Sequence, residues 1–122
     1  MRGIIDSDIL IDYLKGREQA KGELGNYALR EISIISWMEV MVGAETSDEE
    51  KACREFLGTF TVHPVTDRIA EEAVSIRKRN HIRLPDAIIW ATARDHGCLL
   101  VSRNSRDFPS DDPGVRILPV SP

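Results

Sequence analysis

Short apolar runs separated by helical segments are the feature of this sequence that most limits its fold. Strands that read as continuous apolar runs, without polar alternation, are typical of parallel sheets that are buried on both faces. Helices between such strands cover those two faces. We therefore expect an α/β fold, a three-layer α/β/α sandwich with a mostly parallel sheet of four to five strands. The expected strands are residues 2–5, 32–35, 98–102 and 115–118, with a weaker one at 59–63.

The segments between these runs carry helix signals. Ser36 and Glu39 have the spacing of a capping box, which predicts a helix that begins at Ser36. Pro85 suits the first turn of a helix, and Gly97 suits the position just past its end. A first helix is expected from residue 7 or 8 to Gly16. Further helices are expected over residues 18–29, 36–43, 47–57, 66–79 and 86–95.

Length and composition exclude several classes of protein. The 122 residues fit one domain, which we expect to span residues 1–122. The chain is 42% hydrophobic and 30% charged, and its apolar runs fall far short of a membrane span of roughly 18 residues. The first residues contain no apolar signal-peptide core. Cys53 and Cys98 are too few for a disulfide framework, so we expect two buried thiols and a cytoplasmic protein.

The charge is unevenly distributed along the chain. The net charge of −4 argues at first against a nucleic-acid partner. Residues 68–106, however, carry 8 basic and 4 acidic side chains, whereas residues 1–67 carry 7 and 13. The dense run at 77–83 has two interpretations, a solvated helix end or a patch that contacts phosphates.

Four acids follow or open the expected elements on the side where parallel sheets bind ligands. Asp6 follows the first strand and Glu39 lies one helical turn after the second. Asp86 opens a helix, and Asp107 lies just past strand 98–102. Each acid alone is explained by a helix cap, a capping box, a first helical turn or a tight turn.

Taken together, these acids predict a metal site. Four carboxylates at one edge of a sheet repel one another, which raises their pKa values unless a cation lies among them. Oxygen ligands at this density suit Mg²⁺ or Mn²⁺. Such an ion activates water and stabilises charge on a phosphoryl group. An acidic pocket beside a basic segment therefore predicts a metal-dependent nuclease.

Four segments carry a family resemblance in addition. They are IIDSDILIDYL at 4–14, SWME with Gly43-Ala44 at 36–44, LPDAIIWATA at 84–93 and LVSRNSRDF at 100–108. In this order and spacing, the chain resembles the PIN-domain ribonucleases, and among them the VapC-type toxins of toxin–antitoxin pairs. The resemblance implies a PIN-like fold and a Mg²⁺- or Mn²⁺-dependent endoribonuclease that cleaves RNA to inhibit growth. It also implies a cognate VapB-type antitoxin and a homodimer.

The resemblance assigns roles to individual residues. Asp6 and Asp86 match the metal-binding aspartates, and Glu39 and Asp107 complete the catalytic set. Asp8 is expected to support these carboxylates. Many PIN domains have Asp where this chain has Asn104, which is then a neutral ligand or a group that orients water. The expected RNA contacts are Arg79, Arg83, Arg103 and Arg106, and the expected dimer contacts are Ile9, Tyr13, Trp37 and Met41.

Two alternatives remain from the sequence. A receiver-type phospho-acceptor signalling domain would use an acidic pair such as Asp6 and Asp8, but it also needs a late lysine, and no lysine follows Lys78. A non-catalytic α/β interaction module would use the four acids only as caps. Titration with Mg²⁺ or Mn²⁺ distinguishes the second alternative, because a genuine metal site stabilises the fold by mass action.

Overall fold

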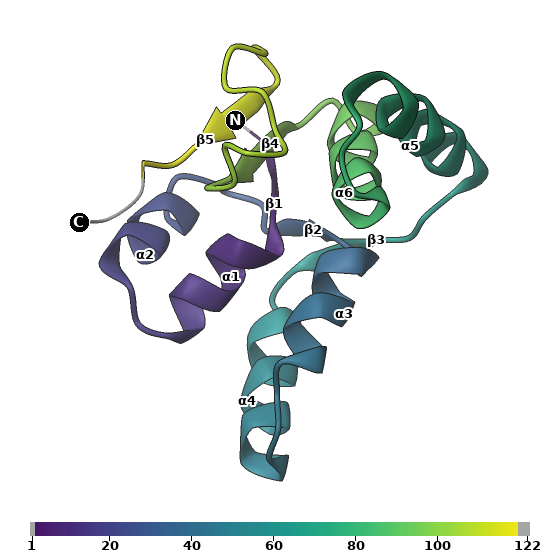
Figure 1. Cartoon of the computed structure of the whole chain (residues 1–122). Coiled ribbons are helices and arrows are strands. Elements are labelled where there is room, and N and C mark those ends of the chain that lie inside the picture. Colours follow the sequence, from purple (N-terminus) through teal and green to yellow (C-terminus); the bar gives the residue numbers. More distant parts are fainter. Residues whose placement is uncertain (1, 120–122) are drawn as a thin grey trace.

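A parallel sheet forms the centre of the molecule. The computed structural model describes residues 2–119, and within them five strands pair in the order β3-β2-β1-β4-β5 (Figure 1). Every pairing is parallel, which confirms the predicted α/β class and parallel sheet. The strands are β1 (Gly3–Ile5), β2 (Glu31–Ser33), β3 (Thr61–His63), β4 (Leu99–Ser102) and β5 (Val115–Ile117).

Helices cover both faces of the sheet (Figure 1). Ile4 and Leu100 pair across β1 and β4 and pack with α5 and α6, whereas the next pair, Ile5 and Val101, packs with α1, α2 and α4. The two faces of the central strands are therefore both apolar, as expected for a three-layer sandwich. The helices are α1 (Ser7–Leu14), α2 (Glu18–Leu24), α3 (Ile34–Val42), α4 (Ser47–Leu57), α5 (Asp67–Asn80) and α6 (Leu84–Asp95).

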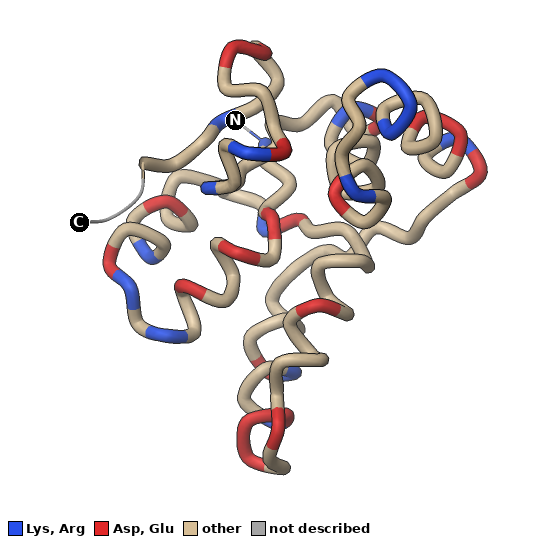
Figure 2. Tube along the Cα trace, viewed as in Figure 1, with Lys and Arg blue, Asp and Glu red and all other residues tan. Residues whose placement is uncertain are grey.

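Acidic and basic residues gather in different parts of the molecule. Helices α3 and α4 form a hairpin that projects from the sheet (Figure 1). The first turn of α4 carries three acids and makes the tip of this hairpin acidic, whereas the last turn of α5 is basic (Figure 2). The uneven charge along the sequence thus becomes an uneven charge in space.

The predicted capping box of α3 is wrong. The helix begins at Ile34, and Ser33 is its cap because its side chain accepts a hydrogen bond from the backbone N–H of Ile35. Ser36 therefore lies inside the helix, fully buried, and no hydrogen-bond partner is found for its hydroxyl among the described residues. The apolar run that predicted a strand over 32–35 is split between β2 and the start of α3.

Other predictions about helices, cysteines and interfaces have mixed outcomes. Helix α2 ends at Leu24, before the predicted residue 29, and Gly97 has the expected positive φ of 65° just past α6. Both cysteines are free and buried, as predicted. Ile9 is 1% exposed in the core, so its predicted role in a dimer interface is wrong. None of the helices formed by residues 2–119 has the length and apolar character needed to cross a membrane.

Candidate active site

Asp6 lies at the carboxyl end of β1, where it caps α1. Its Oδ1 accepts a hydrogen bond from the Ser7 backbone N–H at 2.8 Å, and its Oδ2 accepts one from the Ser102 hydroxyl at 2.7 Å. Ser102 reaches Asp6 because the parallel register of β1 and β4 ends both strands at the same edge. The two serines fix both oxygens of the carboxylate, which is only 4% exposed.

The pKa of Asp6 is strongly raised. Burial is the largest cause, followed by the negative charge of Asp8 and, more weakly, that of Asp86. The hydrogen bond from Ser102 opposes these effects, and the pKa nevertheless rises to about 7. Burial and neighbouring carboxylates both disfavour the charged form of an acid, so this side chain is poised to gain a cation.

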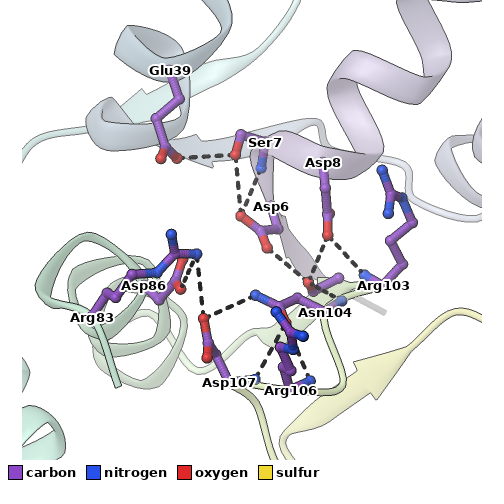
Figure 3. A network of polar contacts seen from close by, with 11 residues as sticks. Asp6, Ser7, Asp8, Glu39, Arg83, Asp86, Arg103, Asn104, Arg106 and Asp107 are labelled. Atoms are coloured by element: carbon purple, nitrogen blue, oxygen red, sulfur yellow. Dashed lines mark hydrogen bonds and ion pairs between the residues drawn. The ribbon is translucent and has the colours of Figure 1, made fainter. Parts of the chain in front are cut away.

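Ser7 connects Glu39 to this carboxylate. The Ser7 hydroxyl donates to Glu39 Oε1 at 2.9 Å and lies 3.5 Å from Asp6 Oδ1. Glu39 therefore points from α3 toward the start of α1, as Figure 3 shows. Glu39 does not act as the return arm of a capping box. The fold brings it close to Asp6, as the sequence predicts.

Asp86 and Asp107 form the opposite side of the site (Figure 3). Asp86 lies in the first turn of α6 and is 7% exposed. Burial and a hydrogen bond shared with Asp107 raise the pKa of Asp86 to about 7, and the same hydrogen bond lowers the pKa of Asp107. Asn104 Nδ2 donates to Asp107 Oδ2 at 3.1 Å, so Asn104 orients this carboxylate.

Arg83 bridges these two acids. Its Nη2 lies 3.3 Å from Asp86 Oδ2 and 3.4 Å from Asp107 Oδ2. Sequence reasoning placed Arg83 with the RNA contacts and missed this pairing. The separation of three residues on a helix makes the contact with Asp86 possible, but nothing in the sequence indicates the contact with Asp107.

Asp8 lies on the other side of Asp6 (Figure 3). Its Oδ2 accepts hydrogen bonds from the Ser102 hydroxyl and from the backbone N–H of Arg103, both at 3.2 Å. Its Oδ1 is buried without a hydrogen-bond partner among the described residues, and burial raises its pKa. The predicted support of Asp6 by Asp8 therefore runs through Ser102, which touches both carboxylates.

The four arginines expected to contact RNA occupy different places. Arg83 and Arg106 lie at the site, and no partner is found for the Arg106 side chain within residues 2–119 (Figure 3). The Nε of Arg103 donates to Asp12 on α1 at 2.7 Å, and Arg79 lies 3.6 Å from Glu72 on α5. Arg103 nevertheless lies beside Asp8, so three of the four surround the acidic cluster, whereas Arg79 pairs within α5 (Figure 3).

The donors present fit a hard divalent cation. Within residues 2–119 no three His, Cys, Asp or Glu side chains are placed so as to hold a metal ion together. Mg²⁺, however, usually takes only one or two carboxylates and keeps several waters. The raised pKa values of Asp6 and Asp86 and the unpaired Asp8 oxygen mark buried oxygen groups whose negative charge the nearby arginines only partly offset.

Fold and site together define a class: α/β proteins with a cluster of acids at the carboxyl edge of a parallel sheet. The model of the PIN domain matches residues 4–110, and the chain belongs to this family. The resemblance seen in the sequence is therefore confirmed. The alternative of a receiver-type domain is wrong.

Named relatives and solved structures agree with this assignment. The chain is 33% identical over 117 residues to "Ribonuclease VapC10" of Mycobacterium tuberculosis, covering 87% of this chain and 85% of the relative. It is 43% identical to a chain in "Toxin-antitoxin complex from Klebsiella pneumoniae", with a TM-score of 0.87 and coverage of 93% and 95%. A DNA-bound VapBC structure from Salmonella typhimurium, 22% identical with a TM-score of 0.76 and 97% coverage of both chains, shares the fold.

Proposed function

We propose that this chain is a ribonuclease toxin of the VapC type that a cognate VapB-type antitoxin neutralises. One observation carries the proposal: Asp6, Glu39, Asp86 and Asp107, which are far apart in the sequence, belong to one network of polar contacts at the carboxyl edge of the sheet (Figure 3). The relative named as a ribonuclease and the solved toxin–antitoxin complex support it. The proposal includes one domain over residues 1–122, a cytoplasmic location, an RNA substrate and a homodimer.

We further propose that the enzyme is an endoribonuclease that depends on Mg²⁺ or Mn²⁺. Asp6 and Asp86 would hold the ion, because they are the buried carboxylates whose pKa values are raised to about 7. Such an ion, when bound, offsets negative charge on a phosphoryl oxygen and makes water more acidic.

The remaining side chains bind the substrate and move protons. Glu39 is exposed and held by Ser7, so it can accept a proton from water attacking the phosphate. Asp107, held by Asn104, can orient that water. Arg106 is free to pair with an RNA phosphate.

Cleavage of RNA by the purified chain tests this proposal. We expect cleavage with Mg²⁺ or Mn²⁺ and none with EDTA. Asp86→Asn and Asp6→Asn should each lower the rate by roughly 100-fold or more, as for other positioned catalytic groups. The control is Asp111→Asn, which removes an exposed acid outside the site and should leave the rate unchanged.

Two results would contradict the proposal. Near wild-type cleavage by Asp86→Asn would show that this carboxylate is not needed for catalysis. Failure to cleave any RNA with either ion, while the antitoxin still binds, would favour the non-catalytic interaction module.

A further inference from the structure

Arg83 precedes α6 without capping it through its side chain. It is the N-cap residue of α6, but its side chain makes no capping hydrogen bond. The guanidinium instead lies between Asp86 and Asp107, with its Nη2 within 3.4 Å of an oxygen of each. The side chain is 76% exposed, so it can leave this position without disturbing the core. The neighbouring Ile82, which is 5% exposed, keeps the backbone in place.

This guanidinium forms the ion pairs of the acidic cluster. Among residues 2–119, no other Lys, Arg or His forms an ion pair with any of the four clustered acids. The contact with Arg83 lowers the pKa of Asp107 and opposes the rise of the pKa of Asp86. Arg83 therefore offsets part of the negative charge of Asp86 and Asp107.

A divalent ion and Arg83 compete for the same carboxylate. An ion held by Asp86 would lie within a few ångströms of the guanidinium, and two positive charges at that separation repel strongly in a partly buried site. The guanidinium also occupies a lone pair of Asp86 Oδ2 that an ion could use. Binding of the ion is therefore favoured only when the guanidinium moves away.

We propose that Arg83 is an internal counter-ion that a divalent cation must displace from Asp86 and Asp107. The proposal rests on the metal-dependent function proposed above. It makes Arg83 a determinant of metal affinity: the side chain stabilises the acidic cluster without metal and opposes the entry of the ion.

Mn²⁺ binding measured by isothermal titration calorimetry without RNA tests this role. Arg83→Gln removes the guanidinium and should bind Mn²⁺ at least about fivefold more tightly than the unaltered chain, the scale of typical coupling between two sites. Arg106→Gln is the matched control, because it removes an equal charge from the same site without touching Asp86 or Asp107. Its affinity for Mn²⁺ should change by less than about twofold.

A second measurement follows the guanidinium itself. In the NMR spectrum of the unaltered chain, the Nε–H signal that disappears in Arg83→Gln should shift when Mg²⁺ is added. The corresponding Arg106 signal should shift less.

Each outcome has a distinct meaning. Equal or weaker Mn²⁺ binding by Arg83→Gln would overturn the counter-ion role while leaving the metal site intact. An equal gain in both variants would also overturn it, because the gain would then reflect net charge alone. If neither the unaltered chain nor the variants bound Mn²⁺, the proposed metal-dependent function would fail, and the counter-ion role with it.

Discussion

At the scale of single residues, the partners of a buried acid separate structural carboxylates from those of the site. Glu31 is 2% exposed and binds Arg2 at 2.6 Å, and Glu23 is 4% exposed and binds Arg116 at 2.7 Å. The arginine lowers the pKa of each acid. Asp6 is equally buried but contacts only neutral donors, and its pKa is raised. Asp6 therefore lacks the arginine that keeps the two structural acids charged, and burial favours its neutral form.

Replacement of Ser102 by Ala tests how Asp6 is held. The hydroxyl is fully buried and donates to Asp6 at 2.7 Å, so its loss should cost about 1–3 kcal/mol of unfolding free energy. Because this hydrogen bond lowers the pKa of Asp6, the variant should lose more stability at pH 8, where the carboxylate is charged, than at pH 6. Urea unfolding at both pH values measures this.

The control for this prediction lies in the loop that follows β4. Ser105 is exposed, so Ser105→Ala should change stability by less than about 0.5 kcal/mol at either pH. An equal loss for Ser102→Ala at both pH values would mean that the hydroxyl stabilises packing rather than the charged form of Asp6.

The sequence predicts the acids of the site better than the groups that hold them. Asp6, Glu39 and Asp107 follow apolar runs, and the carboxyl ends of parallel strands share one edge, so their meeting is predictable. The role of Ser102 depends on the register of β1 against β4, and that of Ser7 on the position of α3, and no local pattern encodes either.

At the scale of elements, helix starts are where sequence and structure differ most. Ser33 and Ser36 are both good caps, and the spacing from Ser36 to Glu39 favours the second. The fold selects Ser33 because β2 ends there at the same sheet edge as the neighbouring strands. Glu39 is thereby moved one turn further into α3, facing Ser7. The longer amphipathic helix α5 is predicted closely, over 66–79 against the observed Asp67–Asn80, and it buries Ile69, Ala73 and Ile76.

Two glycines of different elements should respond oppositely to Ala. A Cβ at Gly3 in β1 would lie 2.8 Å from the Tyr27 ring, and that ring is held by its hydroxyl on Glu23. Gly3→Ala should therefore cost about 1–3 kcal/mol of unfolding free energy. Gly22 lies inside α2 with nothing within 4 Å of a Cβ, so Gly22→Ala should add about 0.5–1 kcal/mol.

Urea unfolding of both variants checks this pair. A neutral Gly3→Ala would mean that Tyr27 can move aside, so that β1 does not require glycine. A loss of stability in Gly22→Ala would mean that the added methyl group collides with a neighbouring group, although nothing lies within 4 Å of its position.

At the scale of the whole molecule, the distribution of charge says more than its total. The net charge of −4 suggests no RNA partner, but it combines acids at the tip of α4 with a basic end of α5 (Figure 2). Several acids are neutralised inside the protein by arginines, as Asp12 is by Arg103. An RNA at the site would interact with the surface charges close to it, and the net charge of the whole chain matters less.

The stability of the metal-free protein should depend on pH through the site. Asp6 and Asp86 have pKa values of about 7 in the folded chain, against about 4 when unfolded. Between these values the folded state binds more protons than the unfolded state, so this contribution is fully present below pH ~4 and is lost as the pH rises through ~7. Burial lowers the pKa of His96, which opposes the effect below pH ~6.5.

Thermal unfolding in EDTA and in Mg²⁺ therefore should show opposite trends. In EDTA, Tm should fall by about 5 °C or more between pH 6 and pH 8, because the clustered carboxyls lose their protons. With millimolar Mg²⁺ the stabilisation by the ion should grow over the same range, because binding requires deprotonated ligands. Replacing both Asp6 and Asp86 by Asn should remove both trends, since Asn neither titrates nor carries charge. A Tm in EDTA that is flat or rising from pH 6 to pH 8 would show that the two carboxyls are already charged at pH 6, and the acidic cluster would then need a cation other than a proton to form.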